Sequence, residues 1–145
     1  MTENTGSSML DVDLSDAGEL KTLREDEYKL VVTRADIQPS KSDKVTEGET
    51  RENLRVCLED PNEPEVDDIY AYLPMPNQVW KENNPKDHKK AVNRFKDFID
   101  AFGVEMPLDP SALIGLTGWA LVSEEEDNRD GTMRNGIRRF IAKRK

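Results

Sequence analysis

The chain contains one cysteine and one histidine in 145 residues, and it has no long run of apolar residues. A single thiol, Cys57, cannot form a disulfide within the chain, which suits a reducing compartment. No apolar stretch approaches the roughly 20 residues that a transmembrane helix needs, and residues 1–8 carry no basic residue. We therefore expect a cytoplasmic protein without a membrane span, a secretory signal or a membrane partner.

Residues that carry out catalysis or bind metals are equally scarce. His88 lies on the polar side of a predicted helix and is expected to be a solvated surface residue. Cys57 has no CxxC partner and no neighbouring histidine, so it does not indicate a zinc site, and no P-loop occurs. The acidic run at residues 124–127 lacks the spaced ligands of a calcium loop. We expect no enzyme, no catalytic residue, no metal and no cofactor.

Charged residues, in contrast, are abundant and unevenly distributed. They make up 35% of the chain, as do the hydrophobic residues, and the formal net charge is −9. Residues 132–145 carry six basic residues and no acidic one, so residues 1–131 sum to −15. A small core is therefore expected, with part of the chain disordered. The negative net charge argues against non-specific binding along nucleic acid by the whole surface, but it allows a local cationic site.

The composition divides the chain into two regions. Residues 1–26 are rich in Asp, Glu, Ser and Thr, which predicts an acidic and flexible N-terminal segment. An alternative is a short edge strand with alternating apolar residues Met9, Leu10, Val12 and Leu14. Residues 27–145 are expected to form one domain.

The first half of this domain has three runs with strand character, at residues 28–37, 53–59 and 69–73. In the third run, Tyr70 and Tyr72 point to the outer face, where a half-buried strand normally carries polar groups. The first two runs are joined by a long polar loop, residues 40–52. A loop of this length is more often functional or mobile than purely structural.

The clearest helix is predicted between Asn84 and Gly103. Asn84 is a good N-cap, Pro85 suits the first helical position, and Gly103 favours a C-terminal stop. Apolar residues recur at three- and four-residue spacing and form one stripe. The stripe consists of Ala91, Val92, Phe95, Phe98, Ile99 and Phe102.

The end of the chain is predicted to form a β-hairpin. Residues 113–122 and 133–142 are the two strands, and Asp130-Gly131 is the turn signal between them. Gly115 and Gly118 lie inside the first strand, where glycine typically marks a bend or a close approach of another backbone.

The order of these elements predicts the fold. Three strands, one helix and two further strands describe a mainly β protein: a five-stranded OB-fold-like barrel with one capping α-helix between strands three and four. In that architecture the helix closes one end of the barrel, and a stripe with three phenylalanines suits this position.

Several segments, taken in order, resemble phage-encoded OB-fold single-stranded-DNA-binding proteins and a related group of phage replication or recombination proteins. They are residues 27–32 (EYKLVV) with Ser40-Lys41, residues 69–74 (IYAYLP), residues 95–103, residues 116–119 (LTGW) and residues 130–135 (DGTMRN). The resemblance implies a non-enzymatic DNA-binding protein acting in the cytoplasm of the host cell. Bacterial single-strand binders end in an acidic tail, whereas this chain ends in Lys143-Arg144-Lys145.

Single-strand binders combine a cationic groove with aromatic faces on which bases stack. Tyr70 and Tyr72 are the candidates for stacking. The candidate cations lie on the neighbouring strand, in the loop before it and on the last strand, and are Arg55, Lys41, Lys44, Arg51, Arg134, Arg138 and Arg139. Alternatively, the two tyrosines pack under the N-terminal segment or at a dimer interface.

The predicted function is therefore sequence-independent binding of single-stranded DNA in phage replication or recombination, by base stacking and phosphate neutralisation. Replication or recombination proteins are expected as further partners, and a homo-oligomer is compatible with the sequence. The alternative is an acidic protein-interaction module, or a DNA mimic, that acts on a replication protein. The two readings assign opposite roles to the charged residues.

Overall fold

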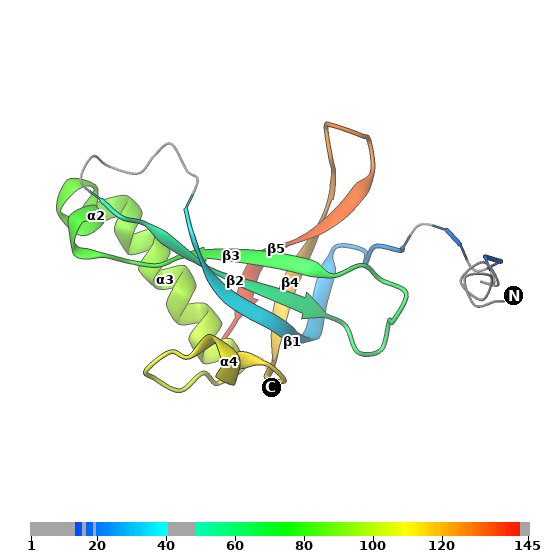
Figure 1. Ribbon diagram of the computed structural model, residues 1–145, viewed down its shortest axis with the longest axis horizontal. Coiled ribbons are helices and arrows are strands. Elements are labelled where there is room, and N and C mark those ends of the chain that lie inside the picture. Colours follow the sequence, from blue (N-terminus) through cyan, green and yellow to red (C-terminus); the bar gives the residue numbers. More distant parts are fainter. Residues whose placement is uncertain (1–13, 16, 19, 41–48, 143–145) are drawn as a thin grey trace, which may run out of the picture.

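The structure is a computed structural model that describes residues 14–15, 17–18, 20–40 and 49–142. Five antiparallel strands are hydrogen-bonded in the order β3-β2-β1-β4-β5. Their bounds are β1 (Asp26–Pro39), β2 (Glu52–Glu59), β3 (Ile69–Pro74), β4 (Thr117–Glu126) and β5 (Met133–Ile141). The edge strands β3 and β5 come into contact, so that the sheet curls into a nearly closed barrel (Figure 1). The predicted OB-like architecture is confirmed.

Three helices follow β3 in the chain: α2 (Gln78–Asn83), α3 (Pro85–Phe102) and α4 (Pro110–Leu113). The caps predicted for α3 are confirmed. The Asn84 side chain accepts a hydrogen bond from the Asp87 amide, and Gly103 adopts the left-handed conformation at φ 64°. None of the helices described here is long and apolar enough to cross a bilayer.

The two short helices were not predicted, and one of them corrects a predicted strand. Residues 113–122 were expected to be extended throughout, but β4 begins only at Thr117. Pro110 takes the first helical position behind an Asp109 cap, and the chain then turns through Gly115 at φ 93°. A four-residue helix is too short to produce a recognisable apolar period in the sequence.

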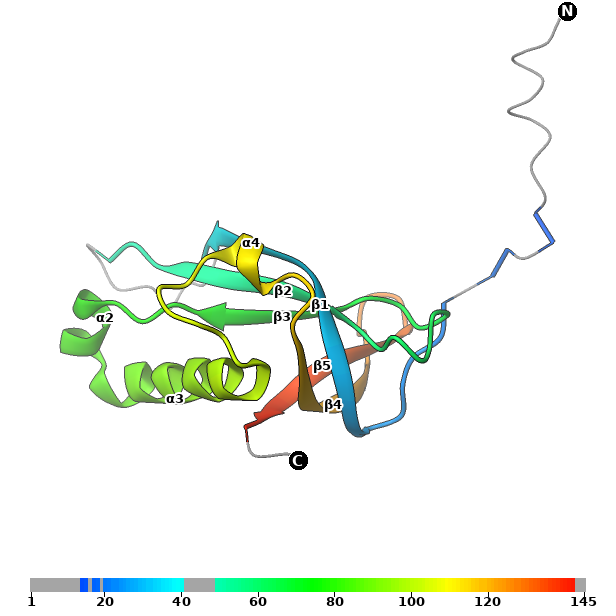
Figure 2. The ribbon, with the colours of Figure 1, turned by 90° about the horizontal axis from the view of Figure 1, so that it is seen from below.

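The core lies between the inner face of the barrel and α3, which runs along one opening of the barrel (Figure 2). Phe98 and Phe102 on α3 pack against Phe140 on β5, with ring centroids 5.2 and 6.0 Å from that of Phe140. Gly118 allows this approach, because a Cβ there would lie 2.7 Å from both the Ala101 carbonyl oxygen and Cδ1 of Phe102. The close approach predicted at this glycine is confirmed.

The segment before β1 is attached to the barrel. Lys21 forms a parallel bridge with Val66, Leu23 is buried in the core, and Asn135 hydrogen-bonds both the amide and the carbonyl of Leu23. Residues from Lys21 onward, before the domain boundary expected after residue 26, are thus attached to the barrel. Three of the four residues of the alternative edge strand, Met9, Leu10 and Val12, lie outside the described residues.

We expect a variant lacking residues 1–20 to keep its free energy of unfolding within about 0.5 kcal/mol, because Leu14 and Leu20 are exposed. The matched change Leu23→Ala should lower that free energy by about 2 kcal/mol or more, since it empties a core position. Urea unfolding followed by circular dichroism measures both. A large loss from the deletion would show that residues 1–20 pack against the barrel.

Candidate nucleic-acid interface

The outer face of β1, β2 and β3 carries two rows of polar and aromatic side chains. The strand register places Arg34 opposite Cys57 and Cys57 opposite Tyr70. It likewise places Asp36 opposite Arg55 and Arg55 opposite Tyr72. Side chains directly opposite each other in antiparallel strands are in contact distance. Each row therefore joins one arginine and one tyrosine across the three strands.

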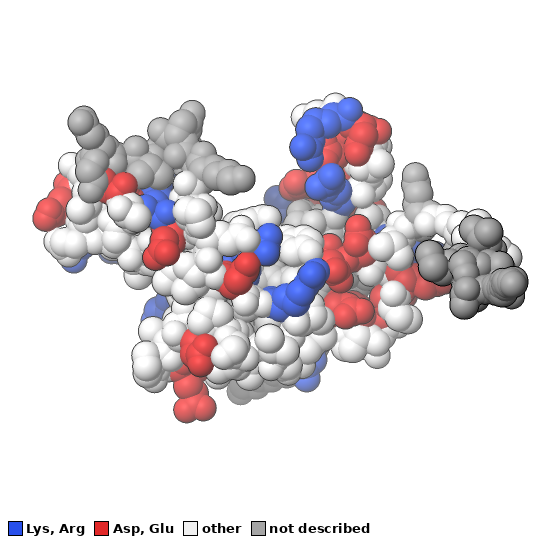
Figure 3. Space-filling view, in the orientation of Figure 1, with Lys and Arg blue, Asp and Glu red and all other residues white. Residues whose placement is uncertain are grey.

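Both tyrosines are accessible on this face. Tyr70 is 41% exposed and Tyr72 is 51% exposed, whereas Ile69, Ala71 and Leu73 between and beside them are buried in the core. Figure 3 looks onto this face, which is largely uncharged over the three strands, with basic and acidic atoms side by side. Residues 1–13, the greater part of the segment under which the tyrosines were alternatively expected to pack, lie outside the described residues.

Arg55 is held in place by a carboxylate. Its Nε and Nη2 donate hydrogen bonds of 3.0 and 2.9 Å to the two oxygens of Asp36. This bidentate contact raises the pKa of Arg55 and fixes the orientation of its guanidinium. Its Cζ lies 5.9 Å from the centroid of the Tyr70 ring, within the range of a cation–π contact.

Arg34 connects the other row. Its Nη2 donates to the Tyr70 hydroxyl at 2.7 Å, to Asp68 at 3.2 Å and to the Cys57 sulfur at 3.6 Å. Partial burial raises the pKa of Tyr70, and the neighbouring Cys57 sulfur raises it further. The contacts from Arg34 fix the orientation of the Tyr70 ring. Cys57 itself is buried beneath this pair.

A groove of about 240 Å³ lies between the two arginines. It is lined by Arg34, Ala35, Asp36, Arg55, Cys57, Tyr70 and Ile114. The lining supplies a flat aromatic edge, two guanidinium groups and exposed apolar surface at Ile114. Such a groove can hold a ligand that has a planar, partly polar group and a negative charge beside it. No cluster of three or more potential metal ligands occurs in the part of the chain that the structure describes.

Arg51 does not belong to this surface. Its Nε donates to Glu49 at 2.6 Å, the two side chains are 6% and 0% exposed, and its Cζ lies 3.6 Å from the Trp80 ring centroid. The guanidinium therefore connects the start of β2 to α2 inside the molecule. Lys41 and Lys44, the other predicted cations of this loop, lie outside the described residues.

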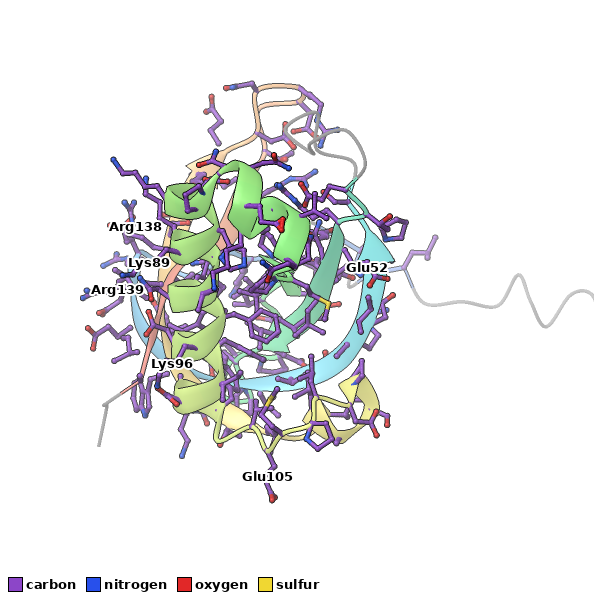
Figure 4. The ribbon with its side chains drawn as sticks, turned by 90° about the vertical axis from the view of Figure 1, so that its left-hand side faces the viewer. Glu52, Lys89, Lys96, Glu105, Arg138 and Arg139 are labelled. Atoms are coloured by element: carbon purple, nitrogen blue, oxygen red, sulfur yellow. The ribbon has the colours of Figure 1, made fainter. Side chains whose placement is uncertain are left out.

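The predicted cations of the last strand also lie apart from the tyrosines. Figure 4 places Arg138 and Arg139 beside α3, on the side of the barrel opposite Glu52 of β2. Arg138 pairs with Glu25 at 3.0 Å. Arg134 pairs with Asp127 at 3.0 Å, near the tip of the β4–β5 hairpin. Of the nine predicted binding residues, the structure brings together Arg55, Tyr70 and Tyr72.

The residues that sequence reasoning missed are Arg34, Asp36 and Asp68. Strict alternation from Leu30 and Val32 would point Arg34 into the barrel. A register shift between Val32 and Arg34 reverses that alternation and turns Arg34 outward. A β-bulge has no distinct signal in this stretch of sequence, so the arginine closest to Tyr70 could not be identified.

Two residues of the acidic run 124–127, at the end of β4 and just after it, have partners in the structure. Glu124 accepts a hydrogen bond from the Thr22 hydroxyl, and Asp127 pairs with Arg129 and Arg134. Hydrogen bonds from the side chain and backbone of Arg129 lower the pKa of Asp127 to about 2. These contacts stabilise the hairpin tip.

No protein-family model matches the chain, and none of the curated proteins compared with it is similar in sequence. We call the outer surface formed by Arg34, Asp36, Arg55, Tyr70 and Tyr72 the tyrosine face.

Proposed function

We propose that the protein binds single-stranded DNA without sequence preference on the tyrosine face. The observation that carries this proposal is the pair of exposed tyrosines on β3, each in register with an arginine-bearing row. Unpaired bases stack on aromatic faces, and every base offers such a face, so stacking is independent of sequence. In OB folds the outer face of strands two and three is the usual site for oligonucleotides, although a fold alone does not establish a function.

The spacing of the tyrosines supports stacking on a single strand. Alternate residues of a β-strand are separated by about 6.6 Å. Successive bases of an extended DNA strand can therefore stack on the two rings. Bases inside a duplex are stacked on each other and do not present their faces. The tyrosine face thus favours single strands, or unpaired ends, over duplex DNA.

Phosphate neutralisation is expected to be the smaller contribution. Arg34 and Arg55 each have a carboxylate within 3.2 Å, Asp68 and Asp36 respectively. These carboxylates offset part of the positive charge that phosphates would meet. We therefore expect a shallow dependence of affinity on salt for the residues described here.

The stacking role is tested with the variants Tyr70→Ala and Tyr72→Ala. Each should weaken binding of a short oligo-dT by about 5- to 150-fold, corresponding to about 1–3 kcal/mol per lost base contact. The slope of log affinity against log salt should stay the same, because no charge is removed. The matched variants Tyr70→Phe and Tyr72→Phe keep the ring and should bind much more tightly than the alanine variants.

The charge role is tested with Arg34→Gln and Arg55→Gln. Each should reduce the salt slope, by no more than the value of about 0.7 for one full phosphate contact on a single strand, because a carboxylate already offsets part of each charge. Arg139→Gln on the opposite side of the barrel is the matched control and should leave the slope for the short oligo-dT unchanged. Fluorescence anisotropy at several salt concentrations measures all of these. If the unchanged protein shows no affinity for a dT oligonucleotide of about 30 nucleotides at low salt, the proposal is wrong, and the acidic interaction module remains.

A further inference from the structure

A further aromatic side chain lies on the outer surface of the barrel, on β4. Trp119 is half-buried, whereas both of its neighbours in the strand are buried. The strand register places it between Lys29 of β1 and Ile141 of β5. Arg139 is its diagonal neighbour on β5, because Arg139 pairs with Leu121, two residues further along β4. Side chains at opposite and diagonal positions of antiparallel strands lie within reach of each other. The indole therefore has one cation on each side.

Both of these cations are accessible. Lys29 and Arg139 are exposed, and neither takes part in the ion pairs formed by the described residues. The acidic residue in the same two rows is Glu27, which lies across Leu121 from Arg139. The tyrosine face differs in this respect, because a carboxylate lies within 3.2 Å of each of its arginines. We call the surface formed by Lys29, Trp119 and Arg139 the tryptophan face.

The composition of the tryptophan face matches that of a single-strand contact. Proteins that bind single strands combine cations along the backbone of the nucleic acid with aromatic rings on which bases stack. The other tryptophan of the chain has different surroundings, since Trp80 is 3% exposed and its ring is covered by Arg51 at 3.6 Å. On the tryptophan face, a base can stack on the accessible part of the indole while the two cations meet the flanking phosphates.

The strand β1 connects the two faces. Its second half pairs with β2 and carries Arg34 and Asp36, and its first half pairs with β4 and carries Lys29. Lys29 and Arg34 are five residues apart in the chain, which corresponds to about 16 Å of strand. Figure 2 shows that β1 bends along its length, and Figure 4 places Arg139 on the side of the barrel opposite Glu52 of β2. A ligand in contact with both faces must therefore follow this bend around the barrel.

We propose that the tryptophan face is a second contact for the same single strand of DNA, which follows β1 from the tyrosine face around the barrel. This inference rests on the proposed function and adds the path of the DNA to it. One base stacks on Trp119, and Lys29 and Arg139 neutralise phosphates beside it. Sites on OB folds range from about 4 to 16 nucleotides. The tyrosine face alone corresponds to the lower end of this range, and both faces together correspond to the upper end.

The test compares two dT oligonucleotides, of about 5 and about 16 nucleotides, by fluorescence anisotropy. Trp119→Ala should weaken binding of the longer oligonucleotide by about 5- to 150-fold, as the loss of one stacked base does, and should not affect the shorter one. Trp119→Phe keeps an aromatic ring and should bind the longer oligonucleotide much more tightly than Trp119→Ala. Binding of the shorter oligonucleotide at the original affinity also shows that each variant is folded.

The cations are tested with Lys29→Gln and Arg139→Gln. Each should reduce the salt slope for the longer oligonucleotide by about 0.7, the value for one phosphate contact on a single strand. The slope for the shorter oligonucleotide should stay the same. Lys81→Gln is the matched control, because Lys81 is exposed on α2, at the end of the molecule away from both faces in Figures 1 and 2. It should leave both slopes unchanged.

Intrinsic fluorescence detects the second contact directly. Because Trp80 is buried, a change in tryptophan emission on binding reports on Trp119. The longer oligonucleotide should quench this emission, and the shorter one should not. In Trp119→Phe the longer oligonucleotide should still bind but should no longer quench the emission that remains.

Two results would overturn the proposal. The first is a Trp119→Ala variant that binds both oligonucleotides as the unchanged protein does. The second is a variant that weakens both equally, because Trp119 would then support the fold or the first site rather than a second contact. Failure of the proposed function gives a different result: Tyr70→Ala and Tyr72→Ala would bind the shorter oligonucleotide as the unchanged protein does, or the unchanged protein would bind no DNA.

Discussion

The Phe98→Ala variant is expected to lose about 3–5 kcal/mol of its free energy of unfolding, as other phenylalanine-to-alanine changes in protein cores do. Phe98 is fully buried, and its ring centroid lies 5.0 Å from that of Phe102 and 5.2 Å from that of Phe140. These contacts hold α3 against the barrel. Removing the ring leaves a cavity between helix and sheet, because the surrounding strands are tied into one sheet and relax little.

Denaturant unfolding followed by far-ultraviolet circular dichroism measures this loss. Val92→Ala is the matched control on the same helix, since Val92 is 37% exposed and fills no core position. Its effect should be below about 1 kcal/mol. If Phe98→Ala had an equally small effect, α3 would not be a structural part of the barrel.

The second large effect is expected for Arg51→Met, with a loss of about 3–5 kcal/mol in the free energy of unfolding. The change removes the guanidinium that compensates the buried carboxylate of Glu49. It also removes the contact with the face of Trp80. Asn77 also donates a hydrogen bond of 3.0 Å to Glu49, and a neutral amide does not replace the positive charge of the guanidinium.

A double-mutant cycle separates the charge from the packing. Adding Glu49→Gln to Arg51→Met removes the carboxylate with which Arg51 pairs, so the double variant should recover a large part of the loss. Arg55→Met is the control on the surface of the barrel, where solvent screens the ion pair, and should change stability little. A loss from Arg51→Met no larger than that from Arg55→Met would show that Arg51 is not a structural residue.

The elements of the fold could be predicted because their signals are local. The stripe that contains Phe95, Phe98 and Phe102 predicts α3. Asn84 and Gly103 mark its first and last turns, and they are the N-cap and C-cap in the structure. Alternation in β2 and β3 predicts that Arg55, Tyr70 and Tyr72 point outward, and the structure places them so. The short helices α2 and α4 were missed because a few residues contain no measurable period.

The positions of the charged residues could not be predicted in the same way. Arg51 was expected to bind phosphate because it lies in a polar loop, yet Glu49 and Trp80 bury it. Arg138 and Arg139 were expected on or near the side of the tyrosine face, because the loop before the last strand flanks the ligand face of an OB fold. The barrel instead turns these arginines towards α3.

The sequence by itself determined the order of strands and helix, and hence the barrel, since period and caps depend on neighbours a few residues apart. It also determined that two tyrosines share one outer face. Only the tertiary structure decided which cations accompany them. A one-residue bulge brought Arg34 to Tyr70, and curvature of the sheet separated the tyrosine face from Arg138 and Arg139. Both depend on contacts between residues distant in the chain, which no local pattern records.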